Sequence, residues 1–80
     1  MRYVSLLRSQ AVPAETYVGA TRDLQRRLAE HNARKCRHTR KYAPWSCALA
    51  MRFEDDATAD AFERYLKTGS GRAFAKRHFW

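Results

Sequence analysis

Three side chains suited to phosphate chemistry lie between residues 17 and 31: Tyr17, Arg27 and His31. A guanidinium group binds phosphate oxygens as a planar fork. An imidazole gains and loses a proton near neutral pH, and a phenol can orient a water molecule for attack. Tyr17 lies in a short β-branched segment, and Arg27 and His31 are four residues apart on the helix expected after it. If that helix packs on the strand of Tyr17, the three groups converge.

The periodicity of this helix places the two adjacent arginines, Arg26 and Arg27, on different sides of it. Its apolar stripe consists of Leu24 and Leu28, and at ~100° per residue Arg26 points away from that stripe. Arg27 falls on the flank of the stripe and His31 lies closer to it, so these two stack on one side. We expect Arg26 to be solvated and Arg27 to reach over the neighbouring element. An ordinary surface arginine at position 27 remains the alternative.

Glu63 is the candidate metal ligand. It falls on the flank of a helix expected over residues 57–67, whose apolar face carries Phe62, Tyr65 and Leu66. One hard carboxylate, together with water and a phosphate oxygen, can hold Mg²⁺. The alternative is an exposed glutamate that pairs with Lys67 four residues on.

The charge of the chain predicts a polyanionic partner. Sixteen Lys and Arg face eight Asp and Glu, for a net charge of +8. Nucleic acid is the first expectation and an anionic membrane surface the second. The membrane alternative is weak because no predicted helix pairs a broad apolar face with a basic one. The candidate nucleic-acid contacts lie in the connection after the first helix and in the last basic segment: Arg34, Lys35, Arg37, His38, Arg40, Lys41, Arg72 and Lys76. A merely solvated loop is the alternative for the first six.

The pattern along the chain predicts one α+β domain over residues 1–80. The expected elements are strands 2–8 and 16–19, a helix from 21 to about 31, a strand 46–53, and helices 57–67 and 72–78. The short connection at Pro13 makes the first two strands an antiparallel hairpin.

Several positions carry specific structural expectations. Thr21 is the expected N-cap of the first helix, and Gly19 permits a turn or the close approach of another group. Trp45 is expected to close the core, and Phe74 to face inward. The strand 46–53 is expected to be central, because both of its faces are mostly apolar.

The two cysteines predict a reducing compartment. Cys36 and Cys47 lack metal-site spacing, and a zinc site built from them with His31 and His38 matches no standard pattern. With no signal peptide and no apolar run of the ~20 residues that span a bilayer, we expect reduced thiols in a cytoplasmic protein.

An ordered set of short motifs resembles a known family. The motifs are Tyr17-Val18-Gly19, then Asp23-Leu24-x-Arg26-Arg27-Leu28-x-Glu30-His31-Asn32, then Pro44-Trp45, then Phe62-Glu63-Arg64-Tyr65-Leu66-Lys67-Thr68-Gly69-Ser70-Gly71-Arg72. Together they resemble the GIY-YIG nuclease superfamily, in particular small single-domain members related to the catalytic N-terminal domain of the bacterial excision-repair incision subunit. The fold that this implies is a three-stranded antiparallel sheet flanked by helices, in β-β-α-β-α-α order.

The resemblance also implies roles for the candidate residues. Arg27 would hold the scissile phosphate and Glu63 a single Mg²⁺ or Mn²⁺ ion. Tyr17 would orient or deprotonate the attacking water, or His31 would serve as the base or relay; the sequence leaves that choice open. The implied function is metal-dependent endonucleolytic cleavage, of DNA in the first place and in a DNA-repair setting.

The chain departs from the family pattern at its first motif. Ser5 falls at the position of the first tyrosine, and Tyr3, two residues earlier on the same face, is the remaining candidate there. Ala33-Arg34 replaces a glycine that is often seen in close relatives. The alternative function is therefore a catalytically inactive DNA- or RNA-binding module. A third possibility is an interaction domain that acts through a protein partner, and a partner or a homodimer could also supply specificity.

Overall fold

The chain forms three strands and three α-helices around one sheet. In the computed structural model, which describes residues 1–80, the elements are β1 (Arg2–Ser9), β2 (Thr16–Thr21), α1 (Leu24–Asn32), β3 (Trp45–Phe53), α2 (Asp56–Leu66) and α3 (Gly69–His78), with a short 3₁₀ turn at Arg40–Tyr42. This element order confirms the predicted α+β fold. None of the helices combines the length and the apolar character that crossing a membrane requires.

The sheet has the order β2-β1-β3, and both strand pairs are antiparallel. The expectation that the strand 46–53 is central was therefore wrong, because β1 lies in the middle. Val4 and Leu6 of β1 are completely buried, whereas Ala48 and Ala50 of β3 are exposed. Alanine counts as apolar in a pattern but is small enough to sit at an exposed edge at little cost.

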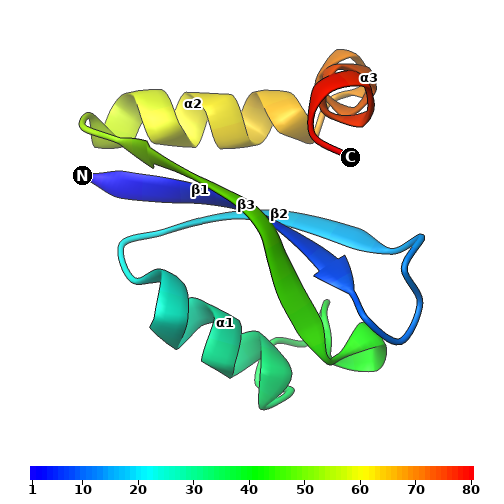
Figure 1. The fold of residues 1–80 in the computed structure, drawn as a ribbon. Coiled ribbons are helices and arrows are strands. Elements are labelled where there is room, and N and C mark those ends of the chain that lie inside the picture. The colour runs from blue at the N-terminus through cyan, green and yellow to red at the C-terminus, as the bar shows by residue number, and fades with distance from the viewer.

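Helices cover both faces of the sheet (Figure 1): α2 and α3 lie on one face and α1 lies on the other. The alternation of β1 explains the two layers. The α2–α3 side holds one buried cluster, made of Val4, Leu6, Ala59, Leu66 and Ala75. The α1 side holds a second, made of Leu7, Ala43 and Trp45 with Tyr17, Leu28 and Tyr42 packed against it. Trp45 is 4% exposed, which confirms its predicted place in the core.

Aspartates start the first two helices. Asp23 caps α1 by accepting a hydrogen bond from the Arg26 amide at 3.0 Å, and Asp55 caps α2 by accepting from the Thr58 amide at 2.8 Å. The expected N-cap at Thr21 was wrong, because Thr21 ends β2 and its hydroxyl accepts from the Asp23 amide instead. The Thr21 hydroxyl thus stabilises the turn before α1, and the Asp23 carboxylate caps the helix.

Arg34 closes α1 in a left-handed backbone conformation with φ of 62°. Its amide donates to the His31 carbonyl and the Lys35 amide donates to the Glu30 carbonyl, each at 3.1 Å. These two hydrogen bonds form a Schellman motif, a helix C-terminus at which glycine is the most common residue. Arginine occupies this position here, and it places a cation directly after the helix.

Gly71 sets the close packing of α3 on α2. The Thr68 hydroxyl accepts from the Gly71 amide at 3.1 Å, so α3 begins at Gly69 and not at Arg72 as expected. A Cβ on Gly71 would lie 1.8 Å from the Tyr65 carbonyl oxygen. The prediction for Phe74 was also wrong: the residue is 37% exposed, because the small residues Gly71 and Ala75 make the buried side of α3.

Replacing Gly71 with alanine is expected to destabilise the protein by about 3 kcal/mol, the upper end of the usual cost of overpacking. The backbone carbonyl that the new methyl group meets cannot rotate away, so α3 must move off α2. Urea unfolding followed by circular dichroism measures this. Gly69→Ala is the matched control, because a Cβ there has no neighbour within 4 Å; equal stability of both variants would contradict the explanation.

Candidate active site

Tyr17 lies at the centre of the candidate site. Its ring passes over Gly19 on the same face of β2, where a Cβ would be only 3.1 Å from the ring. This confirms that Gly19 permits a close approach. The centroid of the His31 ring lies 5.1 Å from that of Tyr17, and Trp45 follows at 6.4 Å, both in edge-to-face geometry. Packing from α1 and β3 therefore fixes the ring.

Lys67 reaches Tyr17 from the other helical layer and also binds Glu63. The Lys67 ammonium lies 5.6 Å from the Tyr17 ring centroid and 3.0 Å from Glu63 Oε2. The pairing of Glu63 with Lys67 on the helix flank is thus confirmed, and it brings the carboxylate to the side of Tyr17. The side chain of Glu63 is 19% exposed, so it remains accessible to a small ion.

Arg27 stands beside Tyr17 on the α1 side. Its side chain is 39% exposed and Nη1 lies 3.4 Å from Glu30 Oε1, whereas the Arg26 side chain is 78% exposed. The predicted division between the two arginines is confirmed. Burial works against the charge of Arg27, but Cys36, Glu30 and Tyr17 outweigh it and raise the pKa above its usual value. Arg27 is a permanent cation next to the phenol.

His31 is the most deeply buried of the candidate residues, at 1% exposure. Its Nδ1 lies 2.6 Å from Thr39 Oγ1. Burial lowers the pKa of His31, the charge of Arg27 lowers it further, and Glu30 opposes both. The imidazole is therefore neutral at pH 7 and is held in one orientation behind Tyr17.

Two residues that support the site were missed in the sequence. Asn32 Oδ1 accepts from the Trp45 amide at 2.6 Å, and its Nδ2 donates to the Trp45 carbonyl at 3.1 Å. Thr39 accepts from Trp45 Nε1 through its carbonyl at 2.9 Å and contacts His31 through its hydroxyl. Both residues lie at or inside a basic, polar stretch that offers no periodicity. Asn32 and Thr39 lie thirteen and six residues before Trp45 in the chain, so no local sequence pattern indicates these contacts.

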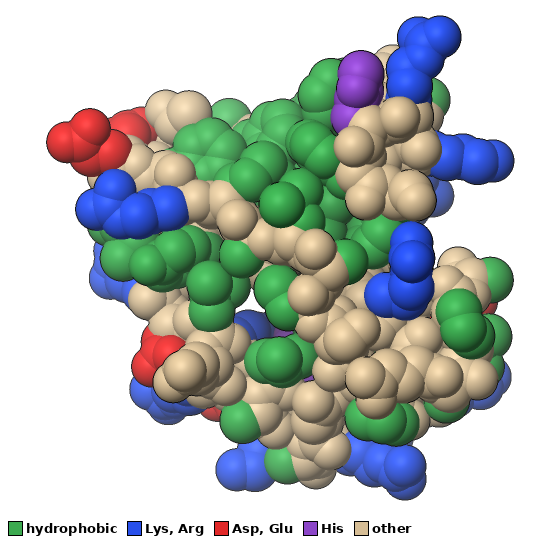
Figure 2. Space-filling model, in the orientation of Figure 1, with side chains coloured by type: hydrophobic (Ala, Val, Ile, Leu, Met, Phe, Trp, Pro, Cys, Tyr) green, Lys and Arg blue, Asp and Glu red, His purple; other side chains and the backbone are tan.

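The candidate nucleic-acid contacts fall into two groups. Six of them lie on the connection between α1 and β3, where all are exposed and none forms an ion pair: Arg34, Lys35, Arg37, His38, Arg40 and Lys41. Arg72 and Lys76 lie on α3 instead, where they line a groove that also contacts Tyr17. Figure 2 shows the same imbalance, with Lys and Arg around much of the rim and few acidic side chains.

Ser5 borders a small, mostly apolar cavity on the α1 side. Ser5 is 5% exposed, and the cavity of about 220 Å³ is lined by Ser5, Leu7, Leu24, Gln25, Arg27, Leu28 and Cys47. Tyr3 pairs with Thr21 and Arg52 nearer the start of β1, and it makes none of the ring contacts that join Tyr17 to His31. Its catalytic role stays a prediction.

The donor set fits a hard divalent cation and not a closed protein cage. No group of three or more His, Cys, Asp or Glu side chains is placed to hold a metal ion, and both cysteines are free. Glu63 offers a single carboxylate whose Oε1 has no protein partner. Mg²⁺ suits such a site, because it keeps several waters and takes oxygen ligands from a substrate phosphate.

The buried His31 predicts a stability loss in mild acid. Its pKa is lowered from the ordinary 6.5 in the folded state, so the unfolded chain binds more protons just below pH 6.5 and stability falls as the pH falls through that range. His31→Gln is expected to flatten this dependence in urea titrations between pH 5 and 7.5. His38→Gln, which changes an exposed histidine, should retain the wild-type slope; flattening by both variants alike would contradict the assignment.

Comparison with known proteins agrees with this geometry. The family model of the GIY-YIG catalytic domain matches residues 3–77 of the 80-residue chain. No curated protein and no solved structure matches the chain. The match covers β2, β3 and all but one residue of β1 and of α3, and it includes Tyr17, Arg27, His31 and Glu63. The chain therefore belongs to the GIY-YIG superfamily, and its domain is of the nuclease type.

Proposed function

We propose that this chain is a divalent-metal-dependent endonuclease that hydrolyses phosphodiester bonds of DNA at the site around Tyr17. The observation that carries the proposal is the junction at the Tyr17 ring. From one side it contacts His31, with Arg27 adjacent, and from the other it contacts Lys67, which holds Glu63. The Tyr17 phenol thus lies beside a neutral imidazole and a guanidinium on one side, and beside an ammonium group that binds a carboxylate on the other.

Arg27 is the proposed phosphate ligand. It is half-exposed and permanently charged, and its only ion pair is a long contact to Glu30 on its own helix. A guanidinium in this position can bind two phosphate oxygens and stabilise the negative charge that grows on them in the transition state. The neighbouring Glu30 limits its motion without neutralising it fully.

Tyr17 is the proposed contact to the attacking water, with His31 as relay. Tyr17 lines the groove, whereas His31 is 1% exposed and lies behind it. Of Tyr17 and His31, only Tyr17 can therefore contact a water molecule in the groove. In the tautomer with the proton on Nδ1, which donates to Thr39, His31 keeps the lone pair of Nε2. Tyr17 can then pass its hydroxyl proton to His31 as it takes one from water.

Glu63 would hold Mg²⁺ or Mn²⁺ through its carboxylate. Such an ion, when bound, neutralises charge on the phosphate oxygens. Lys67 holds the Glu63 carboxylate through an ion pair of 3.0 Å and itself lies over the Tyr17 ring. One protein carboxylate is enough for a cation whose other ligands are water and phosphate.

DNA as the substrate and a role in DNA repair are supported by the resemblance to the excision-repair incision domain. The unpaired basic connection after α1 supports a polyanion in either case. The free cysteines Cys36 and Cys47 suit a reducing, cytoplasmic compartment. A domain of 80 residues has little surface for selecting a site on DNA, so we propose that a protein partner or a homodimer supplies selectivity.

A catalytically inactive DNA- or RNA-binding module is the second candidate. The observation in its favour is Ser5, which stands where the family's first tyrosine is expected. The cavity of about 220 Å³ next to it leaves Arg27 without a phenol on that side. This candidate predicts binding that weakens with salt and no cleavage with any metal.

Glu63→Gln is expected to reduce metal-dependent nicking of duplex DNA at least about 100-fold, because a bound cation contributes several kcal/mol to the transition state. Gel assays in Mg²⁺, Mn²⁺ and EDTA measure this. Glu54→Gln is the matched control: it removes an equal charge from an exposed residue that forms no ion pair. Equal nicking by both variants would rule out Glu63 as the metal ligand.

Ser5→Tyr is expected to fold normally, because the adjacent cavity can accept the ring. The new hydroxyl would lie near Arg27, and we expect the cleavage rate to rise roughly ten-fold or more. Ser5→Phe fills the same space without a hydroxyl and controls for packing. A wild-type chain that binds but does not cut, with no gain in Ser5→Tyr, would favour the inactive module.

A further inference from the structure

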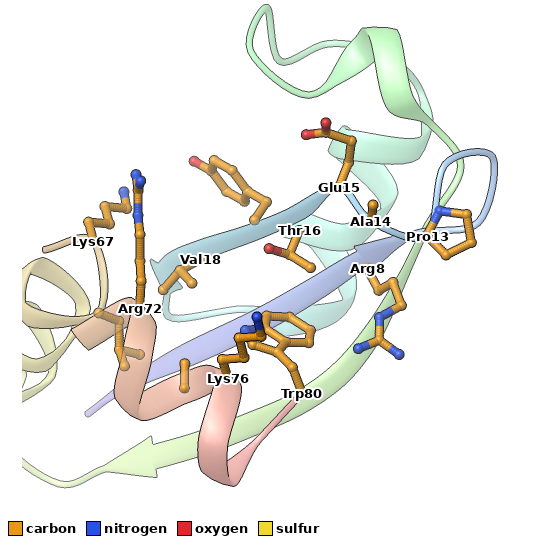
Figure 3. Close-up of a pocket in the computed structure, with 13 residues that line it drawn as sticks. Arg8, Pro13, Ala14, Glu15, Thr16, Val18, Lys67, Arg72, Lys76 and Trp80 are labelled. Carbon is orange, nitrogen blue, oxygen red and sulfur yellow. The ribbon is translucent and has the colours of Figure 1, made fainter. Parts of the chain in front are cut away.

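A groove of about 750 Å³ runs along the free edge of β2, away from the basic connection after α1. Thr16 and Val18 of β2 line it, α3 forms one wall, and the β1–β2 connection at Pro13 forms its far end (Figure 3). Tyr17 also lines it. The groove therefore leads from the candidate active site to a region that the catalytic proposal does not use.

The side chains of this groove are predominantly basic. Lys67 and Arg72 lie together at one end in Figure 3, with Lys76 further along α3 and Arg8 toward Pro13. Arg8, Arg72 and Lys76 form no ion pair. Glu15 is the one acid that lines the groove. Uncompensated cations gathered along a hollow attract a chain of negative charges.

Arg8 differs from an ordinary surface arginine. Its guanidinium carbon lies 5.2 Å from the centroid of the Trp80 ring, a cation–π contact that restrains the side chain. Its Nε is buried and has no hydrogen-bond partner. A buried guanidinium nitrogen without a partner is costly in the free protein. An anion that reaches the Arg8 guanidinium would form charge-assisted hydrogen bonds with its terminal nitrogens, and these would offset part of the cost.

We infer that this groove holds one strand of the nucleic acid next to the bond to be cut, with Arg8 as a phosphate anchor and Trp80 as the residue that positions Arg8. Arg72 and Lys76 contact the phosphates between Arg8 and Tyr17. These contacts go to the backbone, so the groove fixes the register of the strand without selecting its sequence. The inference rests on the nucleic-acid substrate of the proposed function but does not require cleavage.

The groove suits a nucleic-acid strand better than an acidic protein segment. Its cations extend along β2 from Lys67 and Arg72 to Arg8 near Pro13, and Tyr17 is the one proposed catalytic residue that lines it. A phosphate chain presents regularly spaced charges along such a path, and arginine recognises phosphate with its planar fork.

The test measures binding of a labelled oligonucleotide, single-stranded or duplex, by fluorescence anisotropy in EDTA, so that cleavage plays no part. Arg8→Ala is expected to weaken binding roughly ten-fold and to reduce the slope of log affinity against log salt by about 1. Arg52→Ala is the matched control. It removes the same charge from an exposed, unpaired residue on β3, at the opposite edge of the sheet, and should change affinity about two-fold or less.

Trp80 is tested as a positioning residue by a double-mutant cycle. Trp80→Ala should weaken binding about as much as Arg8→Ala, the double variant should lose no more than either, and Trp80→Phe should retain most of the affinity. Thermal unfolding checks that each variant is folded. Additive losses from the two alanine variants would show that Trp80 does not act through Arg8.

The outcomes separate the groove from the proposed function. If the wild-type chain binds neither oligonucleotide, the nucleic-acid substrate itself is wrong, and the groove inference fails with it. If the wild type binds but Arg8→Ala behaves as Arg52→Ala does, only the groove inference is overturned. A loss confined to the single-stranded or to the duplex probe supports the groove and identifies which form of strand it accepts.

Discussion

The Tyr17 ring packs closely over Gly19, two residues along the same strand face, where a Cβ would be 3.1 Å from the ring and would displace it by a few tenths of an ångström. The rest of the site is arranged around this ring. With the ring lying along β2, His31 meets its edge from the α1 layer, and Lys67 lies over it from the α2 layer. Because β2 is an edge strand, the same phenol also faces the groove. The Tyr17 ring, packed on Gly19, thus contacts residues of both helical layers and also lines the groove.

The acidic residues are few, and their positions explain how charge is distributed over the molecule. Asp55 caps α2, while Asp56 and Asp60 hold Arg2 near the start of β1. The pKa of Asp56 is lowered to about 2, first by a hydrogen bond from the amino group of Met1 and then by one from the Arg22 guanidinium. These acids therefore serve the structure at one end of the sheet. Most cations on the groove and on the connection after α1 keep no acidic partner, and that leaves a field suited to a polyanion.

Periodicity and turn chemistry predicted the strand and helix order, the flank position of Arg27 and the burial of Trp45, since each of these depends on neighbours within a few residues. The central strand was predicted incorrectly because exposed alanines in β3 resemble a buried run. The supports of His31 and Trp45 could not be predicted at all: the Thr39 hydroxyl contacts His31 and the Asn32 side chain bonds the Trp45 backbone, and only the fold brings these groups together. The Arg8–Trp80 contact joins residues from opposite ends of the chain, so a local reading of the sequence contains no sign of it.

The central proposal is a metal ion bound at Glu63 near Tyr17. The most direct measurement is the line broadening that Mn²⁺ causes in ¹H–¹⁵N spectra of the labelled protein, recorded with a phosphorothioate oligonucleotide that resists cleavage. We expect the Mn²⁺-induced line broadening to centre on the amides around Glu63, Lys67 and Tyr17, and EDTA to reverse it. Broadening confined to the acidic start of α2 at Asp55 and Asp56, with the Glu63 amide unaffected, would contradict it.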